Sequence, residues 1–178
     1  FFPIGETIVT WTATDMVGNT SSIEQKITVT DSTFPILQIP SDIVIEATSY
    51  DQNSVNLGEA VATDNSEIAS ITNDAPEFFT LGETAVTWTA IDSSNNFSSI
   101  TQLVSVVDTT APEISPLEDI ILEATSVDEN IVNLDNPAIS DIQDTTIYLT
   151  APDVFPVGIT TVTWTVVDGS DNSSTADQ

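Results

Sequence analysis

Apolar residues and threonines alternate strictly around each tryptophan of the chain. Residues 86–90 read Val-Thr-Trp-Thr-Ala, and closely similar runs occupy residues 9–13 and 162–166. Alternation with a period of two is typical of a β-strand with one buried face. Because the flanking valines share the face of each tryptophan, we expect the tryptophans to lie in hydrophobic cores, not to stack on bound sugars. The residues concerned are Trp11, Trp88 and Trp164.

The three tryptophan segments are spaced as whole small domains. Consecutive tryptophans lie 77 and 76 residues apart, and a phenylalanine and a glycine precede each of them at similar distances. A period of this length is the size of a small domain, so the chain reads as an array of repeats. We predict that residues 1–30 are the C-terminal part of one repeat, that 31–107 are a complete repeat, and that 108–178 are an incomplete repeat lacking its last strand. The chain is expected to be a window cut from a longer array.

The complete repeat contains further strand signals. Residues 43–47 alternate with period two, and the same register recurs at residues 120–124. Residues 55–62 suggest a second strand interrupted by a bulge near Gly58, and 68–72 a weaker third. In the last strand, Ile100, Val104 and Val106 are expected on the inner face. Turn residues separate these segments and no helical periodicity appears, which predicts an all-β fold of tandem immunoglobulin-like β-sandwich repeats of about 77 residues.

The charge and composition of the chain argue against several classes of function. The chain carries 28 Asp and Glu residues against Lys26 alone, with no His and no Cys, for a formal net charge of −27. Such a surface repels nucleic acid and anionic membranes, and no apolar run is long enough to span a bilayer. Catalytic arrangements built on His or Cys are impossible, and the carboxylates lie at strand ends without an insertion to shape a cleft. We therefore expect a protein that is not an enzyme.

Acidic residues recur at three fixed positions of the repeat. They lie at the start of a repeat, after the second predicted strand and after the tryptophan strand, and in an immunoglobulin-like sandwich these positions share one end. Hard oxygen ligands that converge in this way suit Ca²⁺ at the joint between repeats. The alternative is that each Asp only caps its own turn. The candidate ligands are Asp31, Asp64, Asp92 and Asn96, and, in the next repeat, Asp108, Asp141 and Asp168.

Asn-x-Ser/Thr sequons occupy one equivalent position in all three repeats, on the hairpin after the tryptophan strand. They begin at Asn19, Asn96 and Asn172. Two hypotheses fit: N-glycosylation, which would coat the array at regular spacing, and a purely conformational use of Asn in the turn.

Several motifs together resemble the hyalin repeat (HYR) family. They are Asp-Thr-Thr-Ala-Pro at 108–112, Glu-Ala-Thr at 46–48 and 123–125, Phe-Pro-x-Gly before the strand, and Val-Thr-Trp-Thr-Ala-x-Asp followed by Gly-Asn. The resemblance implies an immunoglobulin-like sandwich in an extracellular, adhesive or matrix protein, and it implies no catalytic activity. Animal members commonly carry a cysteine pair that is missing here, so the microbial, cell-surface branch is expected to be the closer match.

These observations predict a structural repeat region of an extracellular cell-surface protein, such as a stalk, sheath, surface layer or filament. Its expected partners are neighbouring copies of itself or other surface proteins. Ca²⁺ is the only cofactor that the pattern of acidic residues indicates. The alternative function is an adhesin module that binds a glycan or protein through its loops, because residues 142–148 differ from the equivalent loop of the preceding repeat.

Overall fold

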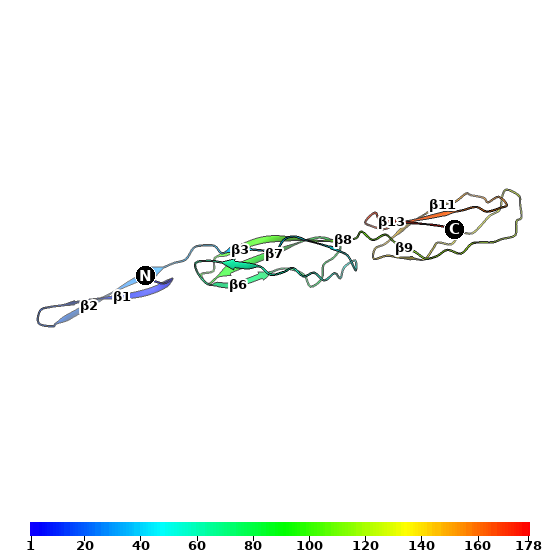
Figure 1. Ribbon diagram of the computed structural model, residues 1–178. Helices are drawn as coiled ribbons and strands as arrows, with labels where there is room; N and C mark the ends of the chain where they lie inside the picture. Colours follow the sequence, from blue (N-terminus) through cyan, green and yellow to red (C-terminus); the bar gives the residue numbers. More distant parts are fainter. The chain divides into compact units, whose positions relative to one another are not determined.

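The computed structural model describes residues 1–178 and is all-β, with thirteen strands and no helix (Figure 1). Its sheets are of the sandwich type, which confirms the fold class expected from the alternating pattern. The structure has no helix of the length and apolarity needed to cross a membrane. The strands fall into three groups along the chain.

The first group is a two-stranded antiparallel hairpin formed by β1 (Gly5–Thr14) and β2 (Thr20–Val29), drawn in blue in Figure 1. Trp11 lies opposite Ile23 in this ladder and is 61% exposed. The expectation that Trp11 belongs to a core was therefore wrong. Residues 1–30 form only this hairpin, so no second sheet is present in this segment to cover the indole ring.

The second group holds six strands in two sheets. A four-stranded sheet has the order β4-β8-β7-β6, and a two-stranded sheet pairs β3 with β5. The strands are β3 (Ile36–Gln38), β4 (Ile43–Glu46), β5 (Val61–Thr63), β6 (Ile68–Asn73), β7 (Gly82–Asp92) and β8 (Phe97–Val107). The strands predicted near 43–47 and 68–72 are present. The second predicted strand is shorter than expected, because residues 55–60 are irregular and pairing begins only at Val61.

The inner face of the second group follows the period-two pattern of the sequence. Val86 and Ala90 are fully buried and Trp88 is 5% exposed, while the alternate threonines of β7 are partly accessible. On β8, Val104 and Val106 are buried as predicted, but Ile100 is 40% exposed. The fully buried Gln102 takes the inward position next to Val104, so the polar residue, not Ile100, begins the buried face.

The third group repeats the tryptophan strand but not all of its neighbours. A three-stranded sheet has the order β11-β12-β13, and β9 pairs with β10. The strands are β9 (Glu113–Ile114), β10 (Ile139–Ser140), β11 (Thr146–Thr150), β12 (Thr163–Val167) and β13 (Ser173–Asp177). We predicted that this repeat lacks its last strand. Instead, β13 occupies that place with five residues, against eleven in the equivalent β8. The strand expected at 120–124 is absent, and these residues are irregular.

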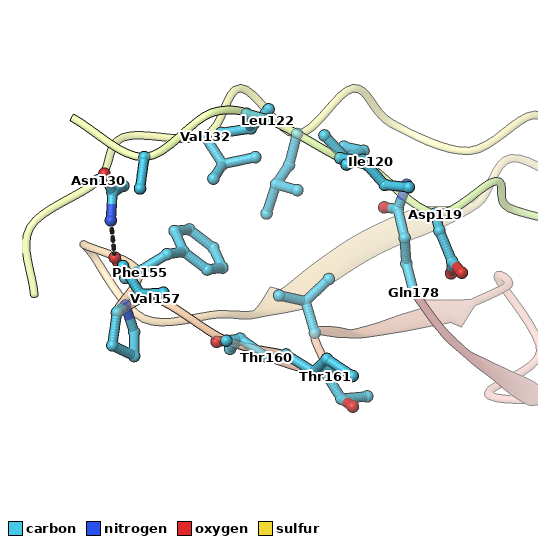
Figure 2. Close-up of a pocket in the computed structure, with 17 residues that line it drawn as sticks. Asp119, Ile120, Leu122, Asn130, Val132, Phe155, Val157, Thr160, Thr161 and Gln178 are labelled. Atoms are coloured by element: carbon cyan, nitrogen blue, oxygen red, sulfur yellow. Dashed lines mark hydrogen bonds between the residues drawn. The ribbon is translucent and has the colours of Figure 1, made fainter. Parts of the chain in front are cut away.

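An apolar cavity of about 540 Å³ lies beside this irregular segment. Figure 2 shows side chains from residues 119–134 on one wall and from 155–162 on the other. Leu122, Val132 and Phe155 belong to its lining. Trp164, on the adjoining strand β12, is nevertheless only 1% exposed, so the aromatic core of this group is closed.

The chain also divides into two compact units whose limits differ from those of the predicted repeats. One unit comprises Phe1–Ile43, Asn56–Glu77 and Thr84–Val104, and the other Val44–Val55, Phe78–Glu83 and Ser105–Gln178. The repeat boundaries at residues 31 and 108 therefore stay a prediction from the sequence.

Candidate metal centre

The structure brings the predicted aspartates together in two separate triads. Asp31, Asp64 and Asp92 each offer one carboxylate oxygen within 4.8 Å of the others. The second triad consists of Asp108, Asp141 and Asp168, and their carboxylate oxygens also lie within 4.8 Å of one another. Each triad lies within a single compact unit. All six aspartates predicted as ligands are thus part of a triad, three per repeat.

Strand parity explains why an aspartate ends each tryptophan strand with its side chain buried. Asp92 is in phase with Val86, Trp88 and Ala90 on β7, and it is only 1% exposed. Asp168, which directly follows β12, is in phase with Trp164 and is 6% exposed. Because side chains alternate between the two faces of a strand, a residue an even number of positions from the tryptophan must point inward. The sequence therefore places a carboxylate at the end of the buried face of β7 and of β12.

Each of these carboxylates closes its hairpin loop through the same hydrogen bonds. Asp92 Oδ1 accepts from the backbone N–H groups of Ser94 (2.9 Å) and Asn96 (2.8 Å), and Asp92 Oδ2 accepts from Asn96 Nδ2 (2.8 Å). Asp168 makes the equivalent bonds with Ser170 and Asn172. Asp15 does the same with Val17 and Asn19 in the first hairpin. The third loop residue has a positive φ in each case, and these residues are Gly18, Asn95 and Asp171.

The same loop also contacts the start of the repeat. Asn96 Nδ2 lies 3.4 Å from the backbone oxygen of Asp31, and Asn172 Nδ2 lies 3.1 Å from that of Asp108. The sequon asparagines Asn96 and Asn172 therefore use their side-chain nitrogen to join two parts of each triad. Asn19 has only the contact to its own hairpin. Whether Asn96 supplies its oxygen to an ion, and whether any of the three carries a glycan, stay predictions.

Two oxygens of the first triad have no hydrogen-bond donor. Asp31 Oδ2 and Asp64 Oδ2 are both inaccessible to solvent and unpaired, whereas the Oδ1 atom of each accepts hydrogen bonds from neighbouring residues. Leaving a charged oxygen buried without a partner is unfavourable, and it costs more when other carboxylates lie nearby. A positive ligand would remove both penalties at once.

Hydrogen bonds keep several of these carboxyl groups ionised. The backbone N–H of Thr33, with the side chains of Asn65 and Ser66, holds the pKa of Asp31 well below its usual range. For Asp168, burial raises the pKa, but the combined hydrogen bonds from Asn172 and Ser170 outweigh it and the pKa is lowered overall. The side chain and backbone of Asn19 likewise lower the pKa of Asp15. Asp31 of the first triad and Asp168 of the second therefore carry a negative charge at neutral pH that a cation can neutralise.

Sequence reasoning missed a glutamine that pairs with each tryptophan and is fully buried in the second group of strands, where it is Gln102. Trp88 Nε1 donates to Gln102 Oε1 (2.9 Å), and Gln102 Nε2 donates to the backbone oxygens of Ser41 (2.7 Å) and Leu57 (3.3 Å). The same indole–amide pair occurs at Trp11 and at Trp164. The signal was available, because a glutamine follows each tryptophan at a distance of fourteen residues.

A buried asparagine was also missed. Asn53 is 1% exposed, accepts from the backbone N–H of Thr48 (2.8 Å), and donates to the backbone oxygens of Ser49 (2.7 Å) and Phe79 (3.0 Å). Asn130 repeats this network in the third group, where Figure 2 shows its bond to Phe155. These asparagines tie a loop to the segment that precedes the tryptophan strand.

The segment that starts the third repeat is held by a glutamate of the second. Glu46 accepts hydrogen bonds from the backbone N–H and the hydroxyl of Thr109 (both 2.8 Å) and from the hydroxyl of Thr110 (3.0 Å). These bonds, chiefly those from Thr109, lower the pKa of Glu46. Since Asp108 directly precedes these threonines, Glu46 helps to fix the position of one triad member along the chain.

No family model matches the chain. Among curated proteins, the chain is 35% identical to hyalin of Strongylocentrotus purpuratus over 192 aligned residues, which cover 98% of this chain and 16% of that protein. It is 36% identical to hyalin of Lytechinus variegatus, with 98% of this chain and 36% of that protein covered. The chain thus spans well under half of the hyalins it matches.

A more distant similarity is found to the rat "Sushi, von Willebrand factor type A, EGF and pentraxin domain-containing protein 1", at 33% identity over 90% of this chain and 5% of that protein. Among solved structures, the extracellular cadherin domains 1–4 of protocadherin gamma B7 align with 98% of this chain and 56% of that chain, at 16% identity and a TM-score of 0.40. The domains 3–6 of the same protocadherin give a TM-score of 0.37, with 97% of this chain and 59% of that chain covered at 16% identity.

The similarity to the hyalins runs along nearly the whole chain and supports the hyalin-repeat-like character expected from the motifs. The microbial type is not supported, because these relatives are sea urchin and rodent proteins.

Proposed function

We propose that this chain is a run of structural repeats from an extracellular, adhesion-type protein, and that each aspartate triad binds one Ca²⁺ ion. The role is non-catalytic: the ion neutralises the carboxylates and fixes the start of a repeat against the hairpin that follows its tryptophan strand. The observation that carries the proposal is the convergence of Asp31, Asp64 and Asp92, with two buried carboxylate oxygens that lack any donor.

The composition of the triads favours Ca²⁺ among common cations. Ca²⁺ takes six to eight oxygen ligands in flexible geometry, and carboxylates together with backbone and amide oxygens provide them. Mg²⁺ demands near-ideal octahedral geometry and keeps several waters, which suits a preformed protein cage less well. The aspartates come from three segments far apart in sequence, so an ion would cross-link those segments as well as neutralise them.

An extracellular location supports this chemistry, because millimolar Ca²⁺ fills even weak sites of this class. Similarity to the hyalins and the high density of negative charge favour the same location. The structural role is preferred to that of an adhesin because both triads use the same repeat positions, as a feature that serves every repeat would.

Glycosylation of the sequons is a separate proposal with a structural condition. Asn19 donates only to Asp15, whereas the Nδ2 atoms of Asn96 and Asn172 each make two hydrogen bonds at a triad. A glycan is attached to that nitrogen and would disturb these contacts at Asn96 and Asn172. Intact mass of protein from a glycosylating host, followed by site mapping, tests this.

Thermal unfolding in chelator and in Ca²⁺ tests the main proposal. A ligand that binds only the native state at 100 times its Kd adds about 2.7 kcal/mol per site, so millimolar Ca²⁺ is expected to raise Tm by several degrees. The double variant Asp92→Asn/Asp168→Asn keeps the shape of both side chains and should lose this response. An equal Tm of the wild-type chain in chelator and in Ca²⁺ would refute the proposed ion sites.

A further inference from the structure

The two aspartate triads differ in what contacts them. In the first, Asp31 Oδ2 and Asp64 Oδ2 are buried without a donor. In the second, Gln143 Nε2 donates to Asp108 Oδ2 at 2.7 Å and to Ser170 Oγ at 2.6 Å. The Gln143 side chain therefore links the aspartate that starts the repeat to the hairpin loop that follows Asp168.

The register of the repeats pairs Gln143 with Ser66, whose hydroxyl lies near enough to Asp31 to lower its pKa but makes no hydrogen bond to Asp31 Oδ2. The Ser66 hydroxyl stays beside its own turn, 3.2 Å from Asp64 Oδ1. In the first triad, Asn65 donates to Asp31 Oδ1, the oxygen that also accepts from Thr33, and so leaves Asp31 Oδ2 free. The two repeats thus direct their amide donors to different oxygens of the equivalent aspartate.

A second difference between the repeats makes room for Gln143. The position equivalent to Ser93 is Gly169, and a Cβ atom there would lie only 2.5 Å from Gln143 Oε1. Any residue with a side chain at position 169 would therefore displace the glutamine from its observed place. Gly169 has no left-handed φ, so turn geometry gives no reason for glycine here. The long side chain of Gln143 therefore occurs together with glycine at position 169. At the equivalent positions of the preceding repeat, the short side chain of Ser66 occurs together with Ser93.

We propose that the triads are cation sites of unequal affinity, and that Gln143 is a built-in competitor for the ion at Asp108, Asp141 and Asp168. This inference rests on the proposed Ca²⁺ function. An amide N–H that donates to a carboxylate oxygen lies where a cation would bind. It also stabilises part of the negative charge that the cation would neutralise. Before an ion can take Asp108 Oδ2, the glutamine must give up two hydrogen bonds, one of them to a charged group. In the first triad, Asp31 Oδ2 and Asp64 Oδ2 have no hydrogen bond to give up, so this triad fills at lower Ca²⁺.

Unequal sites change how an array of repeats responds to Ca²⁺. Identical triads would all fill over one narrow range of concentration, whereas sites tuned by the residue at the Gln143 position fill in sequence. Repeats with serine at this position would become rigid first, and repeats with glutamine later.

A Ca²⁺ titration of the ¹⁵N-labelled 178-residue chain, followed by NMR, reads the two sites separately. The backbone signals of Ser94 and Asn96 report the first triad, and those of Ser170 and Asn172 report the second. In the wild-type chain, the midpoint of the second triad is expected at a Ca²⁺ concentration at least about tenfold higher than that of the first.

Two variants should remove the competitor by independent routes. Gln143→Ser shortens the side chain to that of Ser66, and Gly169→Ser displaces it by adding a Cβ atom. Either is expected to lower the midpoint of the second triad towards that of the first, with no effect on the first. The matched control introduces the glutamine and the glycine into the first triad. The double variant Ser66→Gln/Ser93→Gly should raise the Ca²⁺ concentration at the midpoint of the first triad about tenfold. Indole signals of Trp88 and Trp164 verify that each variant is folded.

The outcomes separate this inference from the function beneath it. Equal midpoints in the wild-type chain, unchanged by Gln143→Ser and Gly169→Ser, would overturn the unequal sites and leave Ca²⁺ binding intact. If neither loop responds to millimolar Ca²⁺ in any variant, both the ion sites and their inequality are refuted. A second triad that binds more tightly than the first would also overturn the role of Gln143.

Discussion

The two triads show how the same ligands acquire different properties from their neighbours. In each, three aspartates occur at equivalent repeat positions. The last of them closes its hairpin through an equivalent asparagine, which is Asn96 in the first triad and Asn172 in the second. Only in the second triad does a glutamine, Gln143, donate a hydrogen bond to one of the aspartates, Asp108. Gly169 leaves the space that this side chain occupies. If the triads bind an ion as proposed, the three aspartates specify its place, and residues outside the triad set how freely the carboxylate oxygens can accept it.

The second and third groups of strands also differ at positions away from the triads. In the second group of strands, Ile43–Glu46 forms β4 beside β8, whereas residues 120–123 have no strand partner and border a cavity of about 540 Å³. The tryptophans are nonetheless equally buried, at 5% and 1% exposure.

The largest effects are expected from the tryptophans. Trp88→Ala and Trp164→Ala each remove a buried indole and should each lower the free energy of unfolding by about 3–5 kcal/mol. Trp11→Ala is the control, because Trp11 is 61% exposed and contributes little burial. Urea unfolding followed by circular dichroism measures the three variants. A cost for Trp164→Ala as small as that for Trp11→Ala would show that the third group of strands lacks a closed core.

The buried asparagines come next. Asn53→Ala and Asn130→Ala each leave backbone groups without their partner, and we expect each to lower the free energy of unfolding by about 2–3 kcal/mol. The two should behave alike, because their hydrogen bonds match. Gln52→Ala, at the exposed position directly before Asn53, is the control and should change stability by less than about 0.5 kcal/mol. A clear difference between Asn53→Ala and Asn130→Ala would mean that the cavity beside Asn130 relaxes to satisfy the freed groups.

The smallest effect concerns pH and Glu46. Hydrogen bonds from Thr109 and Thr110 lower the pKa of Glu46 below its ordinary value of 4.5. A folded-state pKa below the unfolded one means that the stabilisation is fully present above pH 4.5 and is lost as pH falls through the lower folded value. Glu46→Gln should therefore lower Tm at pH 7 and reduce the loss of Tm between pH 5 and pH 3.

Glu123→Gln is the matched control for Glu46→Gln, because Glu123 holds the equivalent place in the third repeat. Differential scanning calorimetry across this pH range in chelator compares the two. Identical pH profiles for the wild-type chain and Glu46→Gln would show that the contact to Thr109 does not stabilise the fold in solution.

Much of this architecture follows from short-range patterns. Alternation located the tryptophan strands, because the direction of successive side chains depends on local backbone geometry. The six aspartates were found because they recur at fixed distances, and the structure places each within a triad. The short strand β3 and the exposure of Ile100 were missed, since both depend on which segment lies opposite, and local sequence does not encode that.

The sequence by itself determined the all-β class, the repeat, and the inward direction of Asp92 and Asp168, since strand parity leaves no other choice. Only the tertiary structure decided which tryptophan is covered, which segments remain irregular, and which oxygens of a triad are free. These features depend on contacts between segments more than thirty residues apart, such as Gln143 with Asp108. Equivalent residues in two repeats can therefore read alike in sequence while their chemistry differs through one side chain packed against them.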